Sequence, residues 1–150
     1  MTLLMALTMN AQHSKDCKKK CDMNKENCEK KCCETKKTRS AVFQYEKDIK
    51  WDDAEPGVVR QVMGYDGQVM LVKVKFQKGA VGKAHHHYHT QVSYVASGKF
   101  EVTIGGKKTI LSAGDGFYVE PDTEHGVVCL EAGMLIDTFS PMRETFIGLK

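Results

Sequence analysis

The stretch between residues 69 and 141 is a succession of short apolar segments separated by turn-forming residues. The segment "VMLVKVKF" (69–76) alternates apolar and polar residues and is rich in valine, as a half-buried strand requires. The segment "TQVSYVASGKFEVTIGGKKTIL" (90–111) predicts three strands, with turns at Gly98 and at the Gly105–Gly106 pair. The segments "GDGFYVEPDTEHGVVCL" and "GMLIDTFSP" continue the pattern, without a long amphipathic helix. Short strands with regular glycine turns predict an all-β sandwich or barrel.

The composition of the chain changes near Ser40, which predicts two unlike parts. Residues 13–40 lack aromatic side chains and are dominated by lysine, glutamate and cysteine, a composition that buries little apolar surface. This tail is therefore expected to be poorly ordered or helical. Aromatic and β-branched residues begin directly after Ser40, so residues 41–150 are expected to form the folded domain.

The formal net charge of +3 conceals an uneven distribution of charge. Residues 11–40 carry ten Lys/Arg and five Asp/Glu, the first ten residues carry none, and the remainder carries 12 basic and 14 acidic residues. The folded domain therefore lacks the basic character of a nucleic-acid binder, and no nucleic-acid partner is expected. No apolar run has the length of a bilayer-spanning helix, which excludes a membrane span.

The first twelve residues, "MTLLMALTMNAQ", contain a short apolar run followed by small residues. This arrangement resembles the end of an export signal, although the basic segment that normally precedes the apolar run is missing. Residues 1–12 are interpreted either as a truncated export signal or as a simple apolar tail. The first interpretation places the protein in the periplasm or cell envelope, and the second places it in the cytoplasm.

Five cysteines lie in the tail, and four of them follow a helical spacing. Steps of four, seven and four residues keep these four thiols within roughly 60° of one another on a helix that turns by about 100° per residue. Such thiols could bind a soft metal ion, pair as disulfides in an oxidising compartment, or have no single role in a lysine-rich tether. The tail cysteines are Cys17, Cys21, Cys28, Cys32 and Cys33, whereas Cys129 lies in the folded domain and is expected to be buried.

Four histidines fall within five residues of the stretch "HHHYHTQ", which begins at His85. The cluster is internal and interrupted by a tyrosine, unlike a purification tag. If the stretch is a strand, its odd-numbered side chains share one face, and imidazoles two residues apart can converge on one metal ion. The residues on that face are His85, His87, His89 and Gln91, whereas His86 is expected at the surface.

The spacing of these residues resembles the first motif of the cupin superfamily, and a second stretch resembles the second motif. The first motif has the family's spacing at Gly79, His85, His87, Gln91 and Gly98. The second motif runs from Gly114 to His125, with ten residues between them, and the resemblance extends over about residues 41–149. It implies a single small β-barrel of the jelly-roll kind with one divalent metal ion in its lumen.

The ligands that the resemblance implies are His85, His87, Gln91 and His125. Gln91 replaces the acidic ligand that is usual in cupins, so the ligand set is neutral and the ion should be a stronger Lewis acid. Histidine and amide ligands suit Zn, Ni, Fe or Mn, and the sequence does not choose among them. His89 is interpreted as a substrate contact or a support for the ligands. Histidines that serve only as hydrogen-bonded core groups are the structural alternative.

The C-terminal segment "LIDTFSPMRETFI" narrows the resemblance to the pectin-degradation cupins of the KdgF type. Asp137, Phe139 and Arg143 match the acid, aromatic and arginine that this family uses as active-site residues. The resemblance implies conversion of 4,5-unsaturated monouronates, released by pectin and alginate lyases, to the linear 5-keto-4-deoxyuronate. The structural alternative is a surface salt bridge between Asp137 and Arg143 that closes the last turn.

The substrate suggests a role for each residue of this segment. Arg143 is expected to bind the uronate carboxylate, Asp137 to transfer a proton between oxygen and C4, and Phe139 to pack on the sugar ring. The expected partners are a small sugar acid and a second copy of the chain in a homodimer. Two other functions stay open: a different cupin enzyme such as a metal-dependent dioxygenase, or a non-catalytic sugar- or metal-binding protein of the cell envelope.

Overall fold

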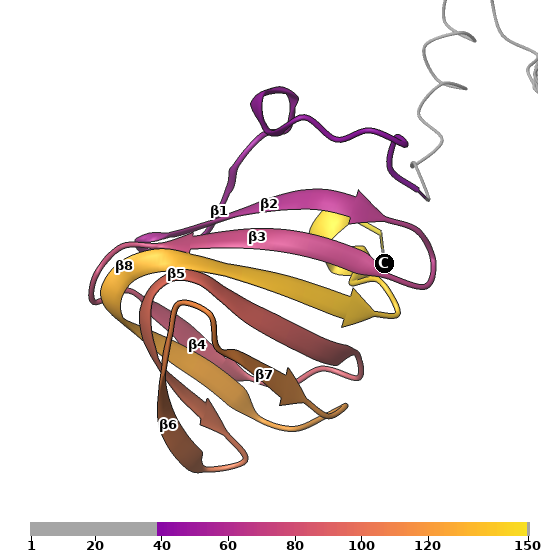
Figure 1. Ribbon diagram of the computed structural model, residues 1–150. Helices are drawn as coiled ribbons and strands as arrows, with labels where there is room; N and C mark the ends of the chain where they lie inside the picture. The colour runs from indigo at the N-terminus through magenta and orange to yellow at the C-terminus, as the bar shows by residue number, and fades with distance from the viewer. Residues whose placement is uncertain (1–38, 150) are drawn as a thin grey trace, which may run out of the picture. The chain divides into compact units, whose positions relative to one another are not determined.

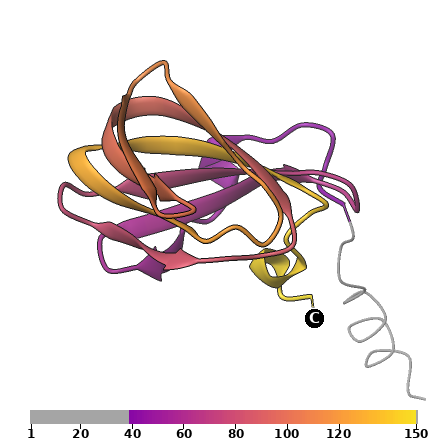
Figure 2. The ribbon, with the colours of Figure 1, turned by 90° about the horizontal axis from the view of Figure 1, so that it is seen from below.

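Two long antiparallel strands, β5 (Thr90–Ile104) and β8 (His125–Ser140), organise the computed structural model, which describes residues 39–149 (Figure 1). The two strands pair along nearly their whole lengths, from Thr90 opposite Ser140 to Ile104 opposite His125. Each strand is long enough to curve from one side of the barrel to the other, as the view from below shows (Figure 2). The expectations for residues 1–12 and for the cysteine-rich tail lie outside the described residues.

The other strands complete one eight-stranded sheet in the order β1-β2-β3-β8-β5-β6, with β4 paired to β8 and β7 paired to β5. They are β1 (Asp52–Glu55), β2 (Val58–Tyr65), β3 (Met70–Phe76), β4 (Val81–His85), β6 (Lys107–Ser112) and β7 (Gly116–Val119). Two short 3-10 helices, η1 (Glu46–Asp48) and η2 (Glu144–Ile147), flank the strands. Neither helix within residues 39–149 is long and apolar enough to cross a membrane. The expected all-β barrel is therefore confirmed.

Gly98 does not form the predicted turn. It lies inside β5, where the pairing with β8 shifts register between Val95 and Phe100 and then resumes. Gly98 has a φ of +82°, and a bulge in a strand uses this left-handed conformation in the same way as a turn does. Its Cα faces Gly133 of β8 so closely that a side chain on either residue would overlap the opposite backbone. The bulge therefore bends two continuous strands instead of ending one.

The barrel interior holds two apolar clusters that follow from the alternation of side chains along the strands. One contains Phe76, Phe100 and Leu135, and the other contains Met70, Val72 and Phe139. The ring centroids of Phe76 and Phe100 are 5.3 Å apart in an edge-to-face contact. Cys129, which was expected to be buried, is 1 % exposed within the first cluster.

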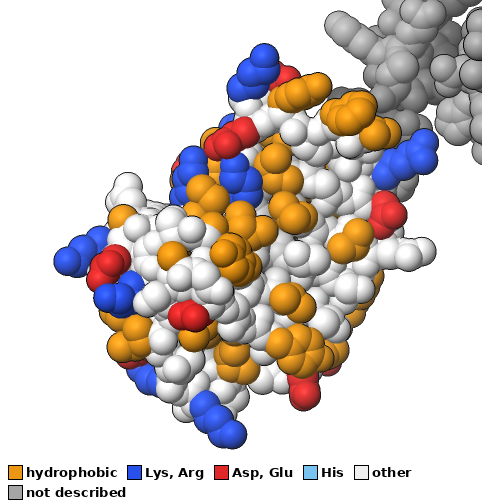
Figure 3. Space-filling view, in the orientation of Figure 1, with side chains coloured by type: hydrophobic (Ala, Val, Ile, Leu, Met, Phe, Trp, Pro, Cys, Tyr) orange, Lys and Arg blue, Asp and Glu red, His pale blue; other side chains and the backbone are white. Residues whose placement is uncertain are grey.

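The alternation also leaves apolar side chains on the outside of the sheet. Leu71 lies between the buried Met70 and Val72 of β3 and is exposed, as are Val92 of β5 and Tyr118 of β7. Leu71 and Val92 both pair with Thr138, and Val92 pairs with Tyr118, so these positions form one row across four strands. The face seen in Figure 3 shows apolar side chains spread among few charged ones.

Substitution of Gly133 by alanine should destabilise the barrel, because the added Cβ would overlap the Ser97 carbonyl oxygen and lie 2.7 Å from the Gly98 Cα. We expect the free energy of unfolding to fall by about 1–3 kcal/mol, the usual cost of overpacking. Gly67→Ala is the matched control, because no atom lies within 4 Å of its added Cβ. Urea unfolding of both variants measures the difference, and equal stability would contradict the proposed bend.

Candidate metal centre and active site

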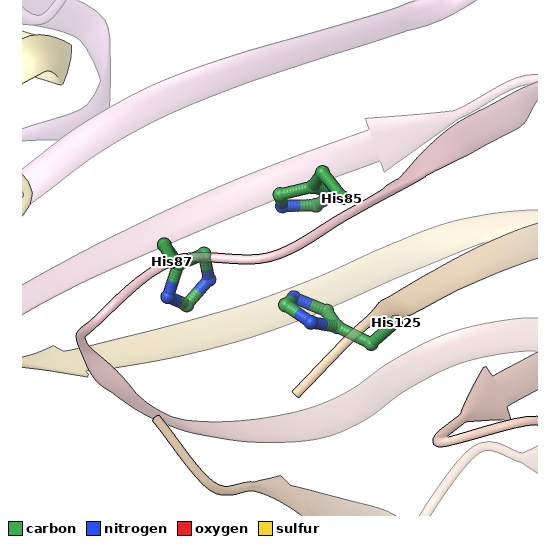
Figure 4. Close-up of side chains that lie close together, drawn as sticks. All are labelled: His85, His87 and His125. Atoms are coloured by element: carbon green, nitrogen blue, oxygen red, sulfur yellow. The ribbon is translucent and has the colours of Figure 1, made fainter. Parts of the chain in front are cut away.

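Three histidine rings face one another (Figure 4); those of His87 and His125 are buried, whereas that of His85 is exposed. His85 ends β4, His87 lies in the loop that follows, and His125 begins β8 directly opposite His85 in the pairing of the two strands. Their possible ligand nitrogens lie within 4.8 Å of one another. Strand pairing and a short loop therefore bring together three residues that are up to forty positions apart in sequence.

Each of the three rings is held by the same backbone interaction. The Nδ1 atoms of the rings lie 2.8, 2.9 and 3.1 Å from a carbonyl oxygen two residues away in the chain. A carbonyl oxygen can only accept, so in each ring Nδ1 carries the proton and donates it. In a neutral ring the other nitrogen, Nε2, then keeps a free electron pair, which is the arrangement that metal-binding histidines use.

Burial favours the neutral form of two of these imidazoles, His87 and His125. Burial, followed by the positive charge of Arg143, lowers the pKa of His87 to about 4. Burial also lowers the pKa of His125, whose Nε2 is enclosed and has no hydrogen-bond partner among residues 39–149. Near neutral pH both rings therefore present bare electron pairs to the interior, as a metal ligand must.

A chain of hydrogen bonds orients the amide of Gln91. Its Nε2 donates to the Ser93 hydroxyl over 2.9 Å, and that hydroxyl donates to Asp137 over 2.6 Å. Because the Ser93 proton is used on the carboxyl group, the Ser93 oxygen must accept from the amide NH2. The amide oxygen of Gln91 is thereby turned toward His87, at 3.1 Å from its Nε2.

The contact between Gln91 and His87 indicates a cation. In the neutral His87 ring Nδ1 carries the proton, so the Nε2 electron pair faces another electron pair on the amide oxygen. A positive ion against both atoms relieves this repulsion and also provides a partner for the enclosed Nε2 of His125. Three imidazole nitrogens and one amide oxygen form a neutral, borderline-hard donor set, so the residues present fit a divalent metal ion.

His85, His125 and Gln91 line a cavity of about 260 Å³ that the predicted C-terminal residues also line, and His87 lies beside it against Gln91. Asp137 and Phe139 project inward from β8, and Arg143 follows at the start of η2. All three line the cavity together with His85 and His125. Asp137 and Arg143 form no ion pair, which removes the structural alternative of a simple salt bridge.

The environment of Asp137 prepares it for proton transfer. Burial raises the pKa of its carboxyl group to about 6, against the opposing effects of the Ser93 hydroxyl and the positive charge of Arg143. A carboxyl group with a pKa close to neutral exists in both forms at physiological pH. It can therefore accept or donate a proton at an atom held inside the cavity.

His89 occupies a different position from the one that a continuous strand would give it. The stretch from His86 to His89 is a loop between β4 and β5, so the condition of one continuous strand over residues 85–91 is not met. His89 is buried, with its Nε2 3.2 Å from the Met142 carbonyl oxygen and 3.4 Å from a carboxylate oxygen of Glu144. It supports the segment that carries Arg143 and is not among the cavity-lining residues. His86 is exposed, as expected.

Two residues of the site were missed at the level of sequence. Ser93 lies two positions after Gln91 in β5, so its inward direction followed from the strand period. Arg60 lines the cavity from β2, where it stands between Val58 and Val62 at strand spacing. A charged residue on the apolar face of a strand was the available signal.

Comparisons with known proteins agree with this architecture. Residues 72–138 match the family model described as Cupin domain. The curated pectin degradation protein KdgF of Dickeya dadantii is 46 % identical over 99 residues, which cover 65 % of this chain and 90 % of that protein.

Two solved structures are similar in both fold and sequence. The crystal structure of an RmlC-like cupin from Shewanella frigidimarina has a TM-score of 0.71 and 45 % identity, covering 73 % of this chain and 98 % of that chain. The structure of KdgF from a Halomonas species has a TM-score of 0.68 and 40 % identity, covering 71 % and 99 % of the two chains. The chain therefore belongs to the cupin family and, within it, to the group related to KdgF.

Proposed function

We propose that this protein is a metal-dependent enzyme that opens the ring of 4,5-unsaturated monouronates, the products of pectin and alginate lyases, to give the linear 5-keto-4-deoxyuronate. The observation that carries the proposal is one site that combines a neutral metal-ligand set, a carboxyl group with a pKa of about 6 and a guanidinium group that forms no salt bridge within residues 39–149. The name of the Dickeya relative, a pectin degradation protein, supports the same substrate class.

The proposed reaction is an isomerisation, and its bond changes balance without an oxidant. The bond between C1 and the ring oxygen breaks, the hydroxyl group on C1 loses its proton, and C1 becomes an aldehyde. The ring oxygen stays on C5 as a ketone oxygen, and C4 gains a proton. The enzyme has to remove one proton from oxygen, deliver one proton to C4 and stabilise the charge that develops in between.

A divalent ion bound by His85, His87, Gln91 and His125 would supply Lewis-acid stabilisation of a substrate oxygen. Asp137, whose carboxyl group can hold or release a proton near pH 6, serves as the acid–base group that exchanges a proton with C4.

Phe139 and Arg143 position the substrate in this proposal. The Phe139 ring lies 5.6 Å from the His87 ring, centroid to centroid, and provides an apolar surface beside the metal ligands. It packs against the sugar ring and excludes bulk water. Arg143 binds the substrate carboxylate through its planar fork of N–H donors.

Freshly prepared unsaturated galacturonate tests the function directly. The enol-ether absorbance should disappear faster with the metal-loaded protein than without protein, and removal of the metal by a chelator should abolish the acceleration. Consumption of dissolved oxygen by the iron-loaded protein would indicate the dioxygenase alternative. Unchanged substrate in the presence of the metal-loaded protein would contradict the proposed enzyme and favour a binding protein.

Substitution of Asp137 by asparagine should lower kcat by about 100-fold or more, because an amide cannot exchange a proton. The amide oxygen can still accept the Ser93 hydroxyl, so Gln91 should keep its orientation and the metal should stay bound. Steady-state kinetics and elemental analysis measure both quantities. Wild-type turnover in the metal-loaded Asp137→Asn protein would show that Asp137 has a structural role only.

A further inference from the structure

Two arginines from distant parts of the chain meet at one aromatic ring beside the cavity. The guanidinium carbon of Arg60 in β2 lies 4.0 Å from the centroid of Phe146, and that of Arg143 lies 4.3 Å from the same centroid. All three residues line the cavity. Because both distances share one centroid, the two guanidinium carbons lie no farther apart than the sum of 8.3 Å.

Neither guanidinium group has a carboxylate partner among residues 39–149. The Nε atoms of Arg60 and Arg143 are both enclosed and donate to no hydrogen-bond partner within this part of the chain. Stacking on Phe146 holds the planar faces of the groups and uses none of their N–H donors. Because both residues line the cavity, their terminal N–H donors remain available there for an anion.

The other charged groups of the cavity do not neutralise this pair. The carboxylate of Glu55 lies 2.9 Å from the ammonium group of Lys83, and the carboxyl group of Asp137 accepts the Ser93 hydroxyl. Burial lowers the pKa of Arg143 and the positive charge of Arg60 lowers it further, whereas the nearby Asp137 opposes both effects without forming an ion pair. Two like charges at one partly buried place are costly unless an anion joins them.

We propose that Arg60 and Arg143 form one carboxylate-binding clamp around the ring of Phe146, with Arg60 as the second binding group for the sugar acid. This inference rests on the proposed function for the identity of the ligand as a uronate. A planar carboxylate accepts N–H bonds of about 2.8 Å from each of two guanidinium forks, which suits groups held this close together. The clamp thereby selects a sugar acid over a neutral sugar of the same shape.

The clamp also explains how the two ends of the folded domain contribute to one site. Arg60 comes from β2 near its beginning, whereas Phe146 and Arg143 come from the C-terminal 3-10 segment. The ring of Phe146 contacts that of Phe139 with the centroids 5.7 Å apart, so the clamp is continuous with the proposed sugar-packing surface. A carboxylate in the clamp would place the attached sugar ring toward the metal ligands.

Arginine side-chain NMR of the metal-loaded protein tests the clamp without turnover. Saturated galacturonate should shift the ¹⁵N–¹H signals of the Nε groups of both Arg60 and Arg143, whereas galactose at the same concentration should shift neither. Arg60→Gln should weaken galacturonate binding by about 10- to 100-fold, the usual effect of losing hydrogen bonds to a charged group. Arg39→Gln, which changes an exposed arginine, is the matched control and should bind as the wild type does.

Kinetics with the unsaturated uronate distinguish a role of Arg60 in substrate binding from a role in stabilising the fold only. The effect of Arg60→Gln should fall on KM rather than on kcat, because the carboxylate is present in both the ground state and the transition state. Arg60→Lys keeps the charge and about the length of the side chain, so its KM should lie between those of the wild type and Arg60→Gln. This variant also tests the clamp if Arg60→Gln does not fold.

The failure of the clamp differs from the failure of the proposed function. Unshifted Arg60 signals with galacturonate, or unchanged galacturonate affinity in both Arg60 variants, would overturn the clamp even if the uronate ring is opened. Galacturonate-dependent shifts of both arginines in a protein that leaves the unsaturated uronate unchanged would keep the clamp and remove the reaction.

Discussion

The hydrogen bond from each histidine Nδ1 to a nearby backbone carbonyl is the interaction on which the site depends. It sets the tautomer of His85, His87 and His125 and leaves Nε2 with its electron pair. A second set of hydrogen bonds, which joins Gln91 to Ser93 and Ser93 to Asp137, orients the fourth donor by turning the amide oxygen of Gln91 inward. Backbone geometry and one buried carboxyl group thus prepare four donors before a metal ion binds, which lowers the cost of ordering them.

The bend in the two long strands brings the proposed metal ligands and the proposed acid–base group into one interior. β8 carries His125 at its start and Asp137 near its end, and β5 carries Gln91 opposite Phe139. Strands without the bulge at Gly98 would not let both ends of β8 face the same lumen. The close approach of Gly98 and Gly133 is therefore a requirement of the site as well as of the fold.

The part of this arrangement that the sequence predicts is the part with a regular period or a specific spacing. Alternation predicted β3, and the spacing of His85, His87 and His125 predicted a cluster that the structure brings together. A glycine with positive φ occurs in turns and in bulges alike, so the sequence predicted a turn at Gly98 where the structure has a bulge. The contact of Arg60 with Phe146 joins residues 86 positions apart, and no local pattern contains such a contact.

Metal binding by matched histidine variants tests the account most directly. Titration of stripped protein with zinc or nickel ions should give the same tight barrel site in the wild type and in His86→Ala, because His86 is exposed. His125→Ala should bind the metal ion at this site at least about 100-fold more weakly. Loss of a residue that only supports a metal ligand already lowers metal affinity by about 10- to 100-fold, and His125 is itself a proposed ligand. The tail cysteines are common to all three proteins, so the difference reports on the barrel. Unchanged affinity and stoichiometry in His125→Ala would contradict the account.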